Sequence, residues 1–388
     1  MPRASYKRFF RRFLDAGGPR LHFAAHSHHL WPDVSFDAQA QAWLDAAAHV
    51  DQKWDVIFGK LWPRAQAHVA RVLDLPDAAT VAFAPSTHEL VVRLLSSLDA
   101  PKPRVLTTDS EFHSFSRQAR RLEESGDLEV TRVPVREPQT FVARFAEAAS
   151  SQPFDLIFLS HVFFDSGHVT EPLERIVSSV RDDKTVVVVD GYHAFMALPT
   201  SLRELAPRIF YVAGGYKYAM SGEGVCFLHA PPGYAERPRN TGWFAAFGAL
   251  ASAGGGVDYA PGGGRFLGAT FDPTALYRFV AVMDWLEREG LSVEVIDAHV
   301  RHLEERFIEA LDAAALPISS RDLTSSLDHK QRAHFLSFET PRARAHYDKL
   351  LAAGVVTDVR GDRLRIGFGL YHDDEDVLAL IERMRACG

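Results

Sequence analysis

VVVVDGYHAFMALP at residues 186–199 is the most informative stretch of this 388-residue chain. It is followed by AGGYKYAMSGEG at residues 213–224, and the two stretches together indicate the fold class. Four consecutive valines predict a strand that is buried on both faces, as in a parallel sheet. Asp190 ends the valine run, and Lys217 follows a second apolar strand and a pair of glycines. Ligands in such folds bind along the edge where the carboxyl ends of the strands meet, so we expect both charged side chains at that edge.

Outward from these segments, residues 55–230 alternate between strand and helix patterns. Short apolar stretches such as FDLIFLSHV (154–162) predict buried strands, and stretches such as EPLERIVSSV (171–180) predict helices. The alternation indicates an α/β domain with a mostly parallel sheet wound by helices. A glycine- and proline-rich stretch at about 232–270 lacks the Gly-Lys-Ser/Thr of a nucleotide phosphate loop, and the region after it predicts a small α+β domain.

The composition narrows the class of protein. Hydrophobic residues make up 47% and charged residues 24% of the chain, as in ordinary soluble globular proteins. The net charge of −7 argues against a nucleic-acid partner, and no apolar run is long enough to span a membrane. Two cysteines are too few for a disulfide framework. The basic N-terminus MPRASYKRFFRRF fits a transit peptide or a surface helix, and Asp15 and the Gly-Gly-Pro turn after it favour the helix. A cytoplasmic location is the default expectation.

Asp190, His193 and Lys217 form a candidate catalytic group at the expected sheet edge. A carboxylate after a strand is either a turn residue or an anion that keeps a heteroaromatic nitrogen protonated, which makes the ring an electron sink. His193 either orients this carboxylate or is a buried histidine with ordinary partners. Lys217 lies between two tyrosines, where desolvation would lower the amine pKa and make it a Schiff-base nucleophile.

These two segments resemble the class V aminotransferase superfamily of pyridoxal-phosphate (PLP) enzymes, which have fold type I, and look most like kynureninase. The resemblance extends over roughly residues 23–377 at the level of motifs. It implies that Lys217 holds PLP as a Schiff base, that Asp190 pairs with the ring nitrogen, and that His193 and Tyr216 bind the cofactor. The motifs APSTHEL, DSEFHSFS, HVFFDSG, TGWF and LGAT imply further cofactor ligands, some of them from a partner subunit: Ser86 and Thr87 at the phosphate, Phe112 stacked on the ring, Ser166 near the cofactor, and Trp243 and Thr270 on the phosphate side.

The same resemblance implies a substrate site. LRIGFGLYHDDEDV (364–377) matches the family segment in which an arginine, here Arg365, grips the substrate carboxylate, and a guanidinium fork suits a carboxylate. The alternative is a structural ion pair of Arg365 with one of the aspartates at 373, 374 or 376. HFAAHSHHLWP (22–32) matches the kynureninase segment that lines the substrate pocket and implies a role for Ser27. Its histidines lack ligand spacing, so we expect no metal.

Several positions depart from kynureninase and bear on its aryl substrate. Phe115 stands where an aspartate is expected, histidines replace the Asn/Leu-Gly residues of the N-terminal motif, and Ser-Gly-Glu-Gly at 221–224 replaces Gly-Pro-Gly. A cysteine desulfurase is disfavoured, because no cysteine lies in the later loop and Cys226 falls in a predicted buried strand.

We therefore expect a homodimeric PLP enzyme that acts on an amino acid. Arg365 would hold the carboxylate and Lys217 would move the α-proton, followed by kynureninase-like hydrolytic Cβ–Cγ cleavage that releases alanine. Transamination is the alternative, and a cofactor-free binding or regulatory protein is a remote one. The expected parts are an N-terminal segment that lines the site and packs on the small domain (1–45), a large PLP-binding domain (46–250), a glycine-rich crossing loop (251–275) and a small C-terminal domain (276–388).

Overall fold

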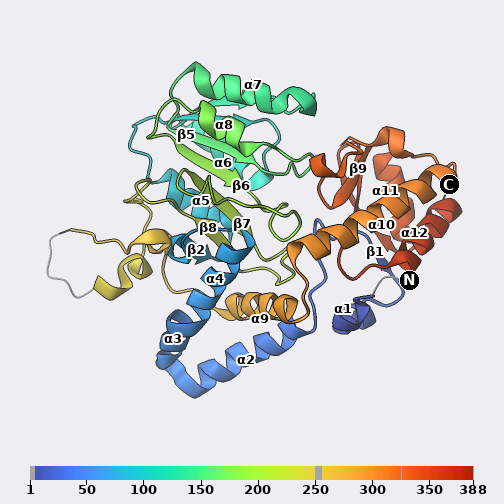
Figure 1. The fold of residues 1–388 in the computed structure, drawn as a ribbon, viewed down its shortest axis with the longest axis horizontal. Coiled ribbons are helices and arrows are strands. Elements are labelled where there is room, and N and C mark those ends of the chain that lie inside the picture. The colour runs from blue at the N-terminus through green and yellow to red at the C-terminus, as the bar shows by residue number, and fades with distance from the viewer. Residues whose placement is uncertain (1–4, 250–255, 325, 388) are drawn as a thin grey trace.

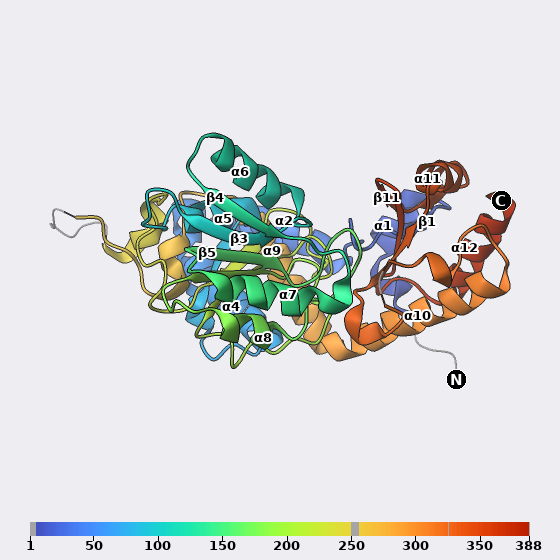
Figure 2. The same cartoon turned by 90° about the horizontal axis from the view of Figure 1, so that it is seen from above.

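The computed structural model describes residues 5–249, 256–324 and 326–387 and has two lobes (Figure 1). The larger lobe contains the central sheet, and the smaller lobe contains the C-terminal elements. Helix α10, Val293–Ala313, runs from the larger lobe into the smaller one (Figure 2). The N-terminal strand β1, Leu21–His22, and the C-terminal helix α12, Asp374–Cys387, both lie in the smaller lobe (Figure 1).

A seven-stranded sheet in the order β2-β8-β7-β6-β5-β3-β4 forms the core of the larger lobe. The pairs from β7 through β6, β5 and β3 to β4 are parallel, and β8 is antiparallel to both β7 and β2. This confirms the expected α/β domain with a mostly parallel sheet. The strands are β2 Val81–Ala84, β3 Arg104–Thr108, β4 Glu129–Val133, β5 Leu156–Ser160, β6 Val186–Asp190, β7 Ile209–Gly214 and β8 Cys226–His229.

Side chains of β6 alternate between two hydrophobic cores, one on each face of the sheet. Val187 and Val189 pack in the core that contains side chains of α4, α7, α8 and α9, whereas Val186 and Val188 pack in the core with α5 and α6. Burial on both faces is why this strand is apolar at every position before Asp190. The helices of this lobe are α2 Val34–His49, α3 Lys53–Val56, α4 Trp62–Val72, α5 Thr87–Leu95, α6 His113–Glu124, α7 Pro138–Ser151, α8 Leu173–Ser179 and α9 Thr274–Arg288.

The smaller lobe is built on an antiparallel sheet in the order β11-β12-β9, covered by helices. The N-terminal segment joins this lobe, because β1 pairs in parallel with β10. Among the described residues, no helix has the length and apolar character needed to cross a bilayer. The elements are α1 Arg11–Gly17, β1 Leu21–His22, β9 Phe335–Glu339, α11 Ala343–Ala352, β10 Val355–Val356, β11 Asp358–Arg360, β12 Arg363–Gly367 and α12 Asp374–Cys387.

Two of the predicted domain boundaries can be compared with the helices of the structure. The boundary at residue 276 falls inside α9, whose side chains belong to the core beneath the central sheet. That helix therefore lies with the larger lobe, because its apolar face is buried there. The predicted crossing loop begins at 251–255, which lie outside the described residues, and farther on it forms a short 3₁₀ helix at Gly262–Phe266 that packs beside β2.

Candidate active site

A cavity of about 330 Å³ lies at the carboxyl ends of β5 and β6 and just beyond the end of β7. This is the edge at which parallel α/β sheets bind ligands. Three parts of the chain line it, namely the larger lobe, the N-terminal segment and β11–β12 of the smaller lobe. The lining residues are His26, Ser27, Thr87, Phe112, Ser160, Val162, Phe164, Asp190, Tyr192, His193, Tyr216, Lys217, Arg360 and Arg365.

Lys217 projects its amine between aromatic and imidazole groups. The Nζ atom lies 2.5 Å from Nε2 of His193, 5.5 Å from the ring centroid of Phe112 and 5.2 Å from that of Tyr192. Burial penalises the ammonium form and Arg365 repels it, which together lower the pKa of Lys217 to about 7. A large fraction of this amine is therefore a free nucleophile at neutral pH.

Asp190 ends β6 and begins the turn that carries Tyr192 and His193. Its carboxylate accepts a hydrogen bond from the Tyr192 N–H at 2.9 Å. Burial raises the pKa of Asp190, against the opposing effects of this hydrogen bond and of Lys217. Gly191 is required in the turn, because a Cβ there would lie 2.0 Å from the Tyr211 ring. Burial and Lys217 hold the pKa of His193 far below its usual range, so its imidazole is neutral.

The N-terminus of α5 begins at the cavity wall, where Thr87 lines the cavity. Ser86 is the N-cap of this helix, and its hydroxyl accepts from the Glu89 N–H at 3.3 Å. A helix N-terminus suits a phosphate because its first N–H groups lack partners within the helix. Ser86 itself is not among the lining residues, so its predicted contact with the phosphate stays a prediction.

Phe112 stands immediately before α6 and lines the cavity, with 41% of its surface exposed. The residue before it, Glu111, was missed by the sequence reasoning. This buried carboxyl accepts hydrogen bonds from the Thr108 hydroxyl at 2.7 Å and the Ser160 hydroxyl at 2.6 Å, and burial raises its pKa to about 7. The hydrogen bond from Ser160 connects the loop before Phe112 to the end of β5. Phe115, where kynureninase would have an aspartate, stacks on a core phenylalanine instead, with the two ring centroids 3.6 Å apart.

Arg365 lies on β12 and is only 3% exposed. The guanidinium donates to the Phe164 carbonyl and pairs with the Asp358 carboxylate, while its Nε has no hydrogen-bond partner among the described residues. The alternative prediction, an ion pair of Arg365 with one of the aspartates at 373, 374 or 376, was wrong. Two of them, at 373 and 376, pair with Lys7, and the one at 374 pairs with His302. The physical reason is register, because Asp358 on β11 stands directly opposite Arg365.

Three of the N-terminal histidines have separate hydrogen-bond partners. His22 hydrogen-bonds to the Tyr371 hydroxyl at 2.7 Å, His28 to the Tyr216 hydroxyl at 2.9 Å, and His29 to its neighbour's carbonyl. Ser27 lines the cavity beside His26, which the sequence reasoning did not single out for the site. His26 is fully buried and neither ring nitrogen has a hydrogen-bond partner in the described structure.

Besides Ser86, three more predicted cofactor ligands are not among the lining residues. Ser166 is buried, and its hydroxyl accepts from the His168 N–H at 3.3 Å. Trp243 stacks on Phe244 with the ring centroids 4.2 Å apart and remains 41% exposed, and Thr270 is exposed. Their contacts with a cofactor stay predictions, including the contribution of Trp243 and Thr270 to a partner subunit.

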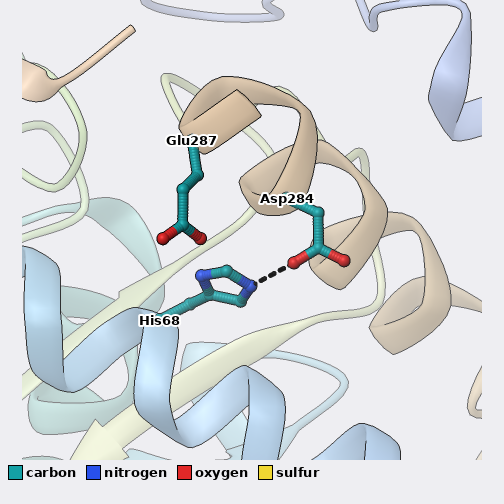
Figure 3. A group of neighbouring side chains, drawn as sticks. All are labelled: His68, Asp284 and Glu287. Atoms are coloured by element: carbon teal, nitrogen blue, oxygen red, sulfur yellow. Dashed lines mark hydrogen bonds and ion pairs between the residues drawn. The ribbon is translucent and has the colours of Figure 1, made fainter. Parts of the chain in front are cut away.

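A separate group of metal-ligand side chains lies between α4 and α9 (Figure 3). Nε2 of His68 lies 2.6 Å from a carboxylate oxygen of Asp284, and Arg64 pairs with the same carboxylate at 2.8 Å. Arg71 pairs with Glu287 at 2.6 Å and contacts Nδ1 of His68 at 2.9 Å. Because an arginine neutralises each carboxylate, this group is an ion-pair network that joins the two helices.

The lining residues fit PLP. Lys217 offers a deprotonated amine for covalent attachment, Asp190 offers an anion for a ring nitrogen, and Phe112 offers an exposed aromatic face. Thr87 at the start of α5 offers a phosphate contact at a helix N-terminus.

Comparisons with known proteins point the same way. The family model described as aminotransferase class-V matches residues 57–380. Isopenicillin N epimerase of Streptomyces clavuligerus is 31% identical over 192 residues, which cover 47% of this chain and 46% of that protein, so the match spans about half the length of this curated relative.

Solved structures resemble the whole chain in fold. A cysteine desulfurase from Thermococcus onnurineus superposes with a TM-score of 0.81 at 17% identity, covering 100% of this chain and 99% of that one. The cystine C-S lyase C-DES, solved with its product cysteine persulfide, superposes with a TM-score of 0.79 at 18% identity, covering 96% and 98%. At such low identity these likenesses show the fold alone.

Proposed function

The chain belongs to the class V aminotransferase family, and on that basis we propose that this PLP-dependent enzyme removes the α-proton of an α-amino acid whose carboxylate Arg365 binds. The observation that carries the proposal is the position of Lys217, an amine with a pKa of about 7 in a cavity that Arg365 also lines. PLP, when bound, supplies an electron sink for the carbanion at Cα.

The residues around Lys217 support proton transfer at this point. Lys217 would serve as the base for the α-proton, because its lowered pKa suits a base that works near neutral pH. The neutral His193 imidazole beside Nζ offers a second nitrogen to hold the proton. Phe112 and Tyr192 cover the amine with aromatic rings, which limits access of water.

The size of the cavity supports a small amino acid as the substrate. Ligand pockets range from about 300 to 1,000 Å³, so a cavity of about 330 Å³ is at the lower end and must hold cofactor and substrate side chain together. Kynurenine-type cleavage is a second candidate, favoured by the position of Ser27 in the cavity wall. A persulfide carrier is disfavoured, because Cys226 is buried with a pKa raised to about 12 and Cys387 lies at the end of α12.

The test is α-proton exchange in D₂O. Purified holoenzyme is incubated with a panel of amino acids that includes alanine, cysteine and kynurenine, and deuterium at Cα is followed by mass spectrometry. We expect exchange with at least one amino acid, its loss in Lys217→Ala, and its retention in the surface control Lys184→Ala. Product analysis then separates alanine release, keto-acid formation and inversion. A PLP-loaded protein that exchanges no amino acid would refute the proposal.

We also propose that two copies assemble with shared sites. The exposed Trp243 and Thr270, outside the cavity of their own chain, support this arrangement. Light scattering is expected to give the mass of a dimer, and a monomer with full PLP affinity would contradict the sharing of sites.

A further inference from the structure

Asp358 on β11 is surrounded by three side chains that line the cavity, namely Arg365, Arg360 and His26. Its carboxylate pairs with Arg365 across the two strands, lies 3.6 Å from a guanidinium nitrogen of Arg360, and lies 3.7 Å from Nε2 of His26. The last two distances exceed those of normal hydrogen bonds. One carboxylate thus has one close partner and two more within a small movement.

We propose that Asp358 competes with the substrate carboxylate for Arg365, and that Arg360 and His26 receive Asp358 when a ligand carboxylate takes its place. This inference rests on the proposed function, in which Arg365 binds the α-carboxylate. It assigns Asp358, Arg360 and His26 as positioning residues that set how tightly the site holds a carboxylate.

The burial of Arg365 is the first reason. A guanidinium that is 3% exposed requires a counter-anion, because removing one partner of a buried ion pair leaves a costly unpaired charge. Asp358 meets this need in the same way as a substrate carboxylate would. The two arginines and Asp358 together carry a net charge of +1, which a single ligand carboxylate neutralises.

The second reason is that the buried imidazole of His26 lacks hydrogen-bond partners. Both ring nitrogens are buried and lack hydrogen-bond partners in the described structure, and buried polar groups are rarely left this way. The ring stacks on Phe335 with centroids 4.6 Å apart, and a Cβ at residue 367 would lie 2.1 Å from Nδ1, so Gly367 closes that side. His26 is therefore held in place with Nε2 toward Asp358. Burial lowers its pKa to about 3, so it receives Asp358 as a neutral N–H donor.

The position of Arg360 is the third reason. It lies two residues after Asp358 on β11 and lines the cavity, and 46% of its side chain is exposed. It therefore has the freedom to approach Asp358 once Arg365 is taken by a ligand. Ligands that lack a carboxylate leave the Arg365–Asp358 pair intact. Replacement of Asp358 by a ligand carboxylate at Arg365 therefore lets the site discriminate amino acids from simple amines.

The experiment compares two carbonyl reagents on the holoenzyme. Aminooxyacetate carries a carboxylate and O-methylhydroxylamine does not, and both remove PLP from a lysine with a change in visible absorbance. In Asp358→Asn we expect the half-saturating concentration of aminooxyacetate to fall about ten-fold, the effect of removing one charge-assisted competitor. In His26→Phe, which keeps the stacking but loses the N–H donor, we expect it to rise several-fold. O-methylhydroxylamine is the reference for each variant, because both reagents react at the same lysine and respond alike to any change in its pKa, so the expected changes for aminooxyacetate are taken relative to it.

Asp373→Asn is the matched control, because Asp373 pairs with Lys7 and does not line the cavity. An unchanged or raised half-saturating concentration in Asp358→Asn would overturn the inference. If that variant does not fold, an unchanged value in His26→Phe would overturn it independently. Failure of the proposed function has a different signature, in which Arg365→Gln reacts with both reagents as the wild type does.

Discussion

Lys217 is expected to react with acylating reagents at neutral pH far faster than an ordinary lysine. Burial of the amine and repulsion from Arg365 both lower the pKa of Lys217, so the rate of this reaction depends on pH in the neutral range. With a pKa of about 7, about half of the Lys217 amine is neutral at pH 7. An amine with the ordinary value of about 10.4 is neutral in only about one molecule in 2,500 at that pH, because each unit is a factor of ten.

The sign of the pH dependence follows from this shift. Only the neutral amine reacts, so the reaction rate of Lys217 rises with pH up to about 7 and then levels off. The assay treats apoenzyme with a limiting amount of acetic anhydride over a pH series and measures acetylation of each lysine peptide by mass spectrometry. Lys102, which is exposed, is the internal comparison within the same sample.

Two variants sharpen the assay. Arg365→Gln removes the second largest cause of the lowered pKa, so the midpoint for Lys217 should move to higher pH. Asp373→Asn, in a pair outside the cavity, should leave the midpoint where it is. A Lys217 profile that keeps rising to about pH 10, as for an ordinary amine, would refute the reasoning from desolvation.

Three further predictions concern other residues. Gly367→Ala forces a Cβ to within 2.1 Å of Nδ1 of His26 and should lower the free energy of unfolding by about 1–3 kcal/mol in urea titrations; an unchanged value would show that His26 moves freely. Glu111→Ala leaves the Ser160 and Thr108 hydroxyls without their acceptor and should lower the free energy of unfolding by about 1–3 kcal/mol in the same titrations. PLP binding, measured by fluorescence, should also weaken, and a wild-type affinity for PLP would show that Glu111 does not support the site. Asp190→Asn should retain PLP yet slow α-proton exchange about 100-fold or more, and full exchange would exclude the pairing with the ring nitrogen.

The sequence alone was sufficient for the larger lobe and for one wall of the cavity. Valines at 186–189 predict a strand buried on both faces, and this local pattern also places Asp190 at the ligand edge. Lys217 follows β7, the parallel neighbour of β6, so the carboxyl ends of these two strands bring Lys217 and Asp190 to the same edge of the sheet. The superfamily and the cofactor were predicted from these motifs and are confirmed, whereas the kynureninase-type substrate stays a proposal.

The wall of the cavity that contains Arg365 and His26 depends on contacts between distant parts of the chain. Asp358 meets Arg365 because two short antiparallel strands pair in one register, and a shift by one residue would have exchanged the partner. His26 reaches the same place because β1 pairs with β10, a contact between residues more than 300 positions apart in the chain. Hydrophobic periodicity reports which face of an element is buried, but not which distant side chain packs against that face, and for this reason the partners of a buried charge were set by the folded structure.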